Sequence, residues 1–268
     1  MSVGVTMTTL AARTIDALRA EHDALAHLVP TFTDDQLSGP SGASEWSVAQ
    51  VLSHLGSGSE ISLASLQAAL GQGEAPDDDF NRSVWDRWDS MTPVEQRDGF
   101  LQHDRTLVEA LEALSPEQQA SLEVPLAFLP APLSVAGYGG IRLNEVAHHS
   151  WDVRVAADTD SGLLDSSTTV LLEHLSGELG FFLGFLGKAD RVDDRVVLAV
   201  GETGHGIVID DSVSLESATD EATATFEGPT EAALRLISGR LKPTYTPAGV
   251  SVTGNISLDQ LREVFPGF

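Results

Sequence analysis

The chain has no cysteine among its 268 residues, and this absence narrows the chemistry available to it. Disulfides, metal sites built from thiolates and a cysteine nucleophile are all excluded. Any thiol chemistry would therefore need a thiol brought in from outside the chain.

Basic residues are scarce as well. Lysine and arginine together number 15 against 40 aspartates and glutamates, which gives a formal net charge of -25. Such a surface repels polyanions unless its basic residues are clustered, and here they are not. We therefore expect no DNA, RNA or anionic membrane as a partner. The sequence also lacks an apolar signal-peptide core and any apolar run long enough to span a bilayer, so we expect a cytoplasmic protein.

The length and the hydrophobic content of 42% are sufficient for two domains. The first part of the chain has the apolar spacing of amphipathic helices. These helices are predicted at 8–28, 47–70, 92–114, 138–158 and 164–186. Together they predict a helical bundle with one extra helix, which we assign to residues 1–187.

The segment "GQGEAPDDDFNRSVWDRW" interrupts this helical pattern at residues 71–88. It is rich in glycine and aspartate, which favours a loop that crosses the mouth of the bundle. Arg82, Trp85 and Trp88 are then expected near an opening.

The pattern changes after the charged segment "GKADRVDD" at 187–194. Short runs rich in β-branched residues follow, which indicates strands. The predicted strands are 196–200, 206–210, 213–217, 223–227 and 249–254, and the predicted helices are 230–241 and 257–265. We expect residues 195–268 to form a small α+β domain with its sheet and helices in two layers.

Two adjacent histidines stand in the predicted helix 138–158, in "RLNEVAHHSWDV". At about 100° per residue, His149 lies beside the inward apolar stripe and His148 lies on nearly the opposite face. Glu145 and His149 are four residues apart, so their side chains can converge on one ion. A surface hydrogen bond between them would explain the same spacing, and His148 with Asp152 forms a competing pair.

A third ligand has to come from another helix, and His54 is the best candidate. Ser47 and Gln50 form a capping box, which places His54 about two turns inside the helix 47–70. A lone histidine there is more often a core residue. Two histidines and a glutamate are nevertheless a known catalytic-zinc set that leaves a fourth position open. The other helical histidines are expected to be solvated or hydrogen-bonded: His22, His27, His103 and His174.

Two motifs carry a family resemblance. "EWSVAQVLSHLG" (45–56), followed by "LNEVAHHSWDVRVA" (143–156), resembles the mycothiol-dependent maleylpyruvate isomerase family within the DinB-like metal-binding superfamily. The resemblance implies a DinB-like helical bundle, a sterol-carrier-like C-terminal domain and a divalent metal, most simply zinc, on His54, Glu145 and His149. It also implies an active-site arginine from the C-terminal domain. Arg240 in "LISGR" (236–240) is the candidate and Arg235 the alternative, although Arg240 could instead neutralise carbonyl groups at the end of a helix.

These expectations lead to a functional hypothesis. The resemblance implies an enzyme that uses mycothiol for thiol transfer to, or thiol-assisted cis-trans isomerisation of, a small electrophile. Arg82 or Arg240 would hold a substrate carboxylate. Two other hypotheses stay open: a metal-dependent hydrolase that uses metal-bound water, and a non-catalytic module that binds a small ligand or a protein. A monomer and a homodimer are both compatible with the sequence.

Overall fold

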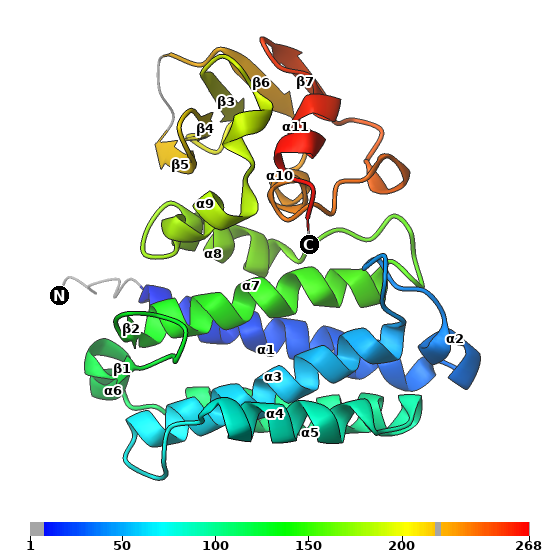
Figure 1. Cartoon of the computed structure of the whole chain (residues 1–268), viewed down its shortest axis with the longest axis vertical. Coiled ribbons are helices and arrows are strands. Elements are labelled where there is room, and N and C mark those ends of the chain that lie inside the picture. Colours follow the sequence, from blue (N-terminus) through cyan, green and yellow to red (C-terminus); the bar gives the residue numbers. More distant parts are fainter. Residues whose placement is uncertain (1–7, 218–220, 268) are drawn as a thin grey trace, which may run out of the picture. The chain divides into compact units, whose positions relative to one another are not determined.

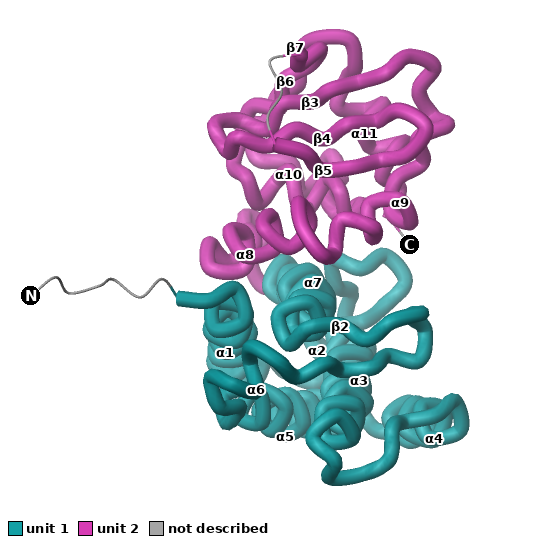
Figure 2. Tube along the Cα trace, turned by 90° about the vertical axis from the view of Figure 1, so that its left-hand side faces the viewer, with its two compact units in different colours: residues 1–156 teal, residues 157–268 magenta. Residues whose placement is uncertain are grey.

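The computed structural model describes residues 8–217 and 221–267. The chain divides into two compact units, Met1–Ala156 and Ala157–Phe268, which are coloured separately in Figure 2. The first unit is helical. The second combines short helices with a five-stranded sheet.

Four long helices build the first unit (Figure 1). They are α1 (Leu10–Leu28), α3 (Val48–Ala69), α5 (Pro93–Glu112) and α7 (Val135–Arg154). Each of them packs on two of the others, which closes a four-helix bundle. A side-chain oxygen accepts a hydrogen bond from a backbone N–H at the start of each helix, from Thr9, Ser47, Thr92 and Ser134 respectively. The predicted capping box of Ser47 and Gln50 is confirmed.

Shorter elements connect these helices. They are η1 (Val29–Thr31), α2 (Asp34–Ser38), α4 (Asp78–Asp89), α6 (Pro116–Ser121) and the antiparallel strands β1 (Glu123–Val124) and β2 (Leu133–Ser134).

The helix α4 replaces most of the loop that the sequence predicted across 71–88, so that prediction was wrong. The three consecutive aspartates, which made the segment look like a loop, form the start of this helix. Asp77 accepts a hydrogen bond from the backbone N–H of Phe80, and Asp78 and Asp79 occupy the first turn, where negative charge is favourable.

Trp88 attaches α4 to the bundle and does not line an opening. Its side chain is fully buried and fills a slot between two glycines, Gly56 on α3 and Gly99 on α5. A Cβ atom at Gly56 would lie 2.1 Å from the Trp88 ring, so only glycine leaves room for it. The indole N–H donates to the carboxylate of Glu60 at 3.1 Å.

A buried polar cluster joins all four long helices, with one member from each of them. The Nδ1 of His22 lies 2.9 Å from the Oδ2 of Asp104. The other oxygen of Asp104 accepts from Ser59 Oγ at 2.9 Å and from Arg142 Nη2 at 3.1 Å. All four residues are at most 5% exposed, so each buried polar group depends on the others.

The second unit contains the predicted strands, two of them with the predicted bounds. They are β3 (Val196–Val200), β4 (His205–Ile209), β5 (Val213–Ser217), β6 (Ala224–Glu227) and β7 (Ser251–Gly254). The strand order is β5-β4-β3-β6-β7, in which only β3 and β6 are parallel. The helices of this unit are α8 (Asp165–Leu175), α9 (Leu183–Leu186), α10 (Thr230–Ile237) and α11 (Leu258–Val264), with short 3-10 turns at Gly180–Phe182, Ala189–Arg191 and Pro243–Tyr245.

The boundary between the units differs from the predicted one at 187–194. The predicted helix 164–186 breaks after Leu175, and its two parts are bent by 85°. The first part, α8, packs on α10, and α9 packs on β5, so both belong to the second unit. The side chain of Glu231 on α10 also accepts a hydrogen bond from the backbone N–H of Leu163. Among the described residues, no single helix is long and apolar enough to cross a membrane, and the bent pair meets that test only when both parts are taken together.

Candidate metal centre

The structure brings together the three residues that the sequence selected as metal ligands. His54 projects from α3, while Glu145 and His149 project one turn apart from α7. The Oε2 of Glu145 lies 3.1 Å from the Nε2 of His54 and 3.7 Å from the Nε2 of His149. One potential ligand atom from each residue lies within 4.8 Å of the others. Two imidazole nitrogens and one carboxylate oxygen therefore converge on one point.

This cluster is open on one side. The side chains of His54 and Glu145 are 40% and 43% exposed, whereas that of His149 is 14% exposed. A small molecule can therefore approach His54 and Glu145 while the His149 ring stays packed. An accessible coordination position of this kind is what distinguishes catalytic from structural zinc sites.

The electrostatics of the cluster keep Glu145 ionised. Partial burial opposes ionisation, but the hydrogen bond with His54 and the nearby imidazole of His149 outweigh it and lower the pKa of Glu145 to about 2. Arg142, one turn earlier on α7, acts in the same direction. The carboxylate therefore offers a full negative charge to a cation across the physiological pH range.

Two residues next to the cluster were not predicted to belong to it. Asp152 accepts from the Nδ1 of His149 at 2.9 Å, and its own side chain is fully buried. Trp46, just before α3, stacks on His149 with ring centroids 5.7 Å apart and also lies 5.1 Å from the ring of His54. The three-residue spacing of His149 and Asp152 was visible in the sequence. The contact of Trp46 depends on how the preceding loop folds.

The prediction that His148 faces away from the core was wrong, whereas His149 is mostly buried, as predicted. His148 is only 4% exposed, and its Nδ1 lies 2.8 Å from the backbone carbonyl of Asn144. The prediction assumed one inward stripe on α7. That helix instead packs against α1, α3, α6 and both short strands, so it is buried on several sides. His148 lies outside the cluster, and Asp152 pairs with His149 and not with His148.

The arginines with predicted catalytic roles lie on other elements than the three proposed ligands, and two of them belong to the second unit. Arg82 is exposed on α4. Arg235, on α10, is 1% exposed and forms a two-pronged ion pair with Glu231 at 2.7 and 2.9 Å, so its charge is already used within the second unit. Arg240 follows α10, is half-buried and donates to the carbonyl of Ser238 at 3.3 Å.

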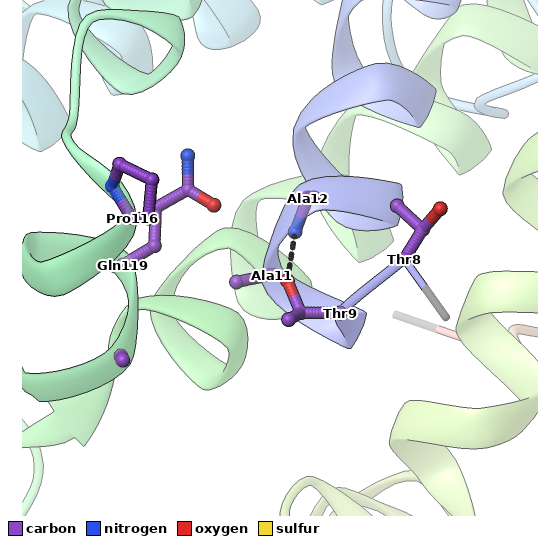
Figure 3. A pocket seen from close by; sticks show the side chains of 7 residues that line it. Thr8, Thr9, Ala11, Ala12, Pro116 and Gln119 are labelled. Atoms are coloured by element: carbon purple, nitrogen blue, oxygen red, sulfur yellow. Dashed lines mark hydrogen bonds between the residues drawn. The ribbon is translucent and has the colours of Figure 1, made fainter. Parts of the chain in front are cut away.

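A separate hollow of about 350 Å³ lies between the start of α1 and α6 (Figure 3). Its lining consists of Thr8, Thr9, Ala11, Ala12, Pro116, Gln119 and Ala120. Among these described residues, none carries a titratable side chain. The lining of this hollow therefore offers no acid, base or metal-ligating group.

Comparison with known proteins points to the same part of the chain. Residues 18–154 match the model of the mycothiol maleylpyruvate isomerase N-terminal domain. Among solved structures, the chain is similar to a mycothiol-dependent maleylpyruvate isomerase, with a TM-score of 0.64, 16% identity, and coverage of 93% of this chain and 98% of the other. A histidine-to-alanine mutant of such an isomerase gives a TM-score of 0.63 at 15% identity and the same coverage. No protein with a curated description matches the chain.

Proposed function

Since the family match covers more than half of the residues, the chain belongs to the mycothiol maleylpyruvate isomerase family, and from this premise we propose that it is a metal-dependent enzyme that uses mycothiol. The single observation that carries the metal assignment is the convergence of His54, Glu145 and His149. All three lie within the matched residues 18–154.

The donor set fits a divalent ion of intermediate softness, most simply zinc. Imidazole nitrogen and carboxylate oxygen are both common zinc ligands, and three protein ligands leave one position for a thiol or water. The ionised Glu145 compensates one of the two positive charges. Bound there, the ion would supply Lewis acidity that lowers the pKa of a coordinated thiol towards neutrality.

The residues of the chain have distinct roles in this proposal. His54, Glu145 and His149 hold the ion, and the exposed side of the cluster admits the thiol and the electrophile. Trp46 stacks on the ring of His149 and also contacts the ring of His54 at a tilt of 46°, so it forms part of the wall beside the cluster. Arg240 and Arg82 remain our candidates for a substrate carboxylate, since a guanidinium binds a carboxylate through two parallel hydrogen bonds.

The thiol has to be a separate small molecule because the chain has no cysteine. Addition of its thiolate to an electrophilic double bond would form a carbon–sulfur bond while the carbon–carbon π bond breaks and its electron pair moves onto the activating carbonyl as an enolate. If the enolate takes up a proton, such as the one that the thiol released, and the adduct leaves, the reaction is thiol transfer. If the carbon–carbon bond rotates and the thiolate leaves again, the result is cis-trans isomerisation. We propose a cytoplasmic enzyme with a small-molecule substrate and this thiol as its partners.

Metal analysis of protein purified without a histidine tag tests the metal assignment. We expect about one divalent ion per chain, and His54→Ala, Glu145→Ala and His149→Ala should each lose most of it. Loss of a ligand should be at least as severe as the 10- to 100-fold losses known for residues that support ligands. His148→Ala is the matched control, since His148 is adjacent but outside the cluster, and it should retain the metal. Full metal content in all three ligand variants would refute the assignment.

Cobalt substitution tests the thiol. Mycothiol added to the cobalt-loaded protein should produce a sulfur-to-cobalt charge-transfer band that is absent from His54→Ala. Glutathione should bind more weakly because its thiol is similar while the rest of the molecule is different. If neither thiol changes the spectrum while esters or amides are hydrolysed without a thiol, the protein is a hydrolase.

A further inference from the structure

We propose that Asp152 is a positioning residue for the metal centre, which holds His149 with its Nε2 directed at Glu145, and that Gly42 leaves the room that the Asp152 carboxylate needs for this. The inference rests on the proposed metal site and assigns the residues that orient one of its ligands. Neither Asp152 nor Gly42 would touch the ion or the reacting atoms.

The hydrogen bond from His149 to Asp152 defines which imidazole nitrogen is available. Asp152 Oδ2 lies 2.9 Å from Nδ1, while Nε2 lies 3.7 Å from the Oε2 of Glu145 at the other side of the ring. A carboxylate accepts but cannot donate, so the proton of the neutral imidazole is held on Nδ1. The lone pair of Nε2 is then directed towards the cluster, as metal coordination requires.

The backbone of Asp152 is bonded to the loop before α3, and the same loop packs closely against the Asp152 carboxylate. The backbone N–H of Gly42 donates to the carbonyl of Asp152 at 2.8 Å. A Cβ atom at position 42 would lie 2.8 Å from Asp152 Oδ1 and 2.9 Å from the Trp151 ring. Any side chain at this position would therefore displace the carboxylate or the adjacent indole.

The same loop also places an aromatic ring against one face of His149. Ser41 closes the loop by donating to the carbonyl of Trp46 from its backbone N–H at 3.2 Å and from its hydroxyl at 2.8 Å. This closure places the indole of Trp46 parallel to the imidazole of His149 within 23°. His149 is thus held at one edge by Asp152 and on one face by Trp46. Its Nε2 edge is left for the ion.

The chain contains a matched control for this pair. His22 and Asp104 make the same Nδ1 to Oδ2 contact at the same 2.9 Å, but inside the bundle core and between residues that are not proposed ligands. A variant of Asp104 therefore reports what the loss of a buried histidine–aspartate pair does to folding alone.

The experiment measures zinc affinity by competition with a chelator, on full-length wild type and on the variants Asp152→Asn, Asp152→Ala and Asp104→Asn. We expect Asp152→Ala to bind zinc 10- to 100-fold more weakly. Asp152→Asn should lie between it and wild type because its amide oxygen can still accept from Nδ1. Asp104→Asn should keep wild-type affinity, while its unfolding midpoint without metal falls by roughly 10 °C. The cobalt d–d spectrum should change in the Asp152 variants and stay unchanged in Asp104→Asn.

The outcomes separate this inference from the proposed function. If wild type binds no zinc, both are wrong. If wild type binds zinc and both Asp152 variants bind it equally well, or if Asp104→Asn weakens binding as much as Asp152→Asn, only the role of Asp152 is refuted. Should Asp152→Ala not fold, Asp152→Asn still decides the question. Gly42→Ala provides an independent variant, expected to weaken zinc binding in the same direction as Asp152→Asn.

Discussion

Two histidine–aspartate pairs in the helical unit have the same contact and opposite settings. His22 with Asp104 and His149 with Asp152 both join Nδ1 to Oδ2 at 2.9 Å, and both aspartate side chains are almost completely buried. Around Asp104 the polar atoms are shared among four helices, with Ser59 and Arg142 on its second oxygen. The ring of His149, in contrast, directs its other nitrogen, Nε2, towards the accessible cluster with His54 and Glu145. The setting, and not the pair, decides whether a histidine supports the fold or offers a ligand atom.

The energetic difference follows from what remains when one partner is lost. Removal of Asp104 leaves Arg142, 5% exposed, without its buried counter-charge, and desolvated charges of this kind are expensive. Removal of Asp152 leaves His149, which is a single imidazole at the border of an open cluster. We call His22 with Asp104 the closed pair and His149 with Asp152 the open pair. We expect the closed pair to determine the stability of the fold and the open pair to determine the affinity for metal.

The largest expected difference between the two pairs is in the free energy of unfolding. Asp104→Ala should lower the free energy of unfolding by about 3–5 kcal/mol, because it leaves the buried Arg142 guanidinium without a carboxylate. Asp152→Ala in the metal-free protein should cost distinctly less. Urea unfolding of both variants with metal removed provides the measurement. Equal losses would mean that the two settings do not differ energetically.

A smaller effect should appear in the pH dependence. Burial opposes ionisation of Asp104, but its hydrogen bond with His22 and the charge of Arg142 prevail and lower its pKa below the ordinary value of 3.8. In the acid range the unfolded chain therefore takes up this proton before the folded protein does. The stabilisation from Asp104 is present above the ordinary pKa and is lost as the pH falls through the lowered one.

Because Asp104 stabilises the fold less as the pH falls, Asp104→Asn should change how stability depends on pH. Unfolding free energies measured between about pH 5 and pH 3 should fall less steeply in the variant than in wild type. The other carboxylates with lowered pKa values contribute equally to both proteins, so the difference in slope isolates Asp104. Parallel slopes would show that Asp104 keeps its ordinary pKa in the fold.

The smallest effect concerns the aromatic neighbours of the two histidines. Phe100 is fully buried beside His22, with ring centroids 6.4 Å apart, whereas Trp46 is 37% exposed over His149. Phe100→Leu should cost about 1 kcal/mol in stability through poorer packing, and Trp46→Leu should stay within about 0.5 kcal/mol of wild type. Thermal unfolding of the two variants in parallel provides the test. A larger loss for Trp46→Leu would assign a folding role to the open pair.

How far the sequence predicted these features depends on how local each one is. The long helices were predictable from the spacing of their apolar residues, and the capping box of Ser47 and Gln50 also marked the start of α3. Glu145 and His149 were predictable because they are four residues apart on one helix. The pair of His22 and Asp104 joins α1 to α5 over 82 positions, and no local pattern indicates it.

The predictions that failed concern segments whose structure depends on contacts with elements that are distant in the sequence. The burial of His148 follows from the several partners of α7, which a single-stripe projection cannot represent. The aspartates before α4 have loop composition, but Asp77 caps a helix that Trp88 then attaches to the bundle. The predicted helix 164–186 breaks near Gly177 and Gly180, and its first part packs on α10, which moved the boundary between the units to Ala156.

The slot that holds Trp88 has a consequence for protein engineering. One indole between Gly56 and Gly99, with Glu60 beneath it, attaches α4 from its inner side. The helix also exposes Arg82 and Trp85, which is 51% exposed, and neither side chain is buried in the bundle as Trp88 is. Randomising these two positions should therefore leave library members folded, so that a screen reports altered selectivity and not loss of protein. Randomising Trp88, Gly56 or Gly99 would yield mainly unfolded clones.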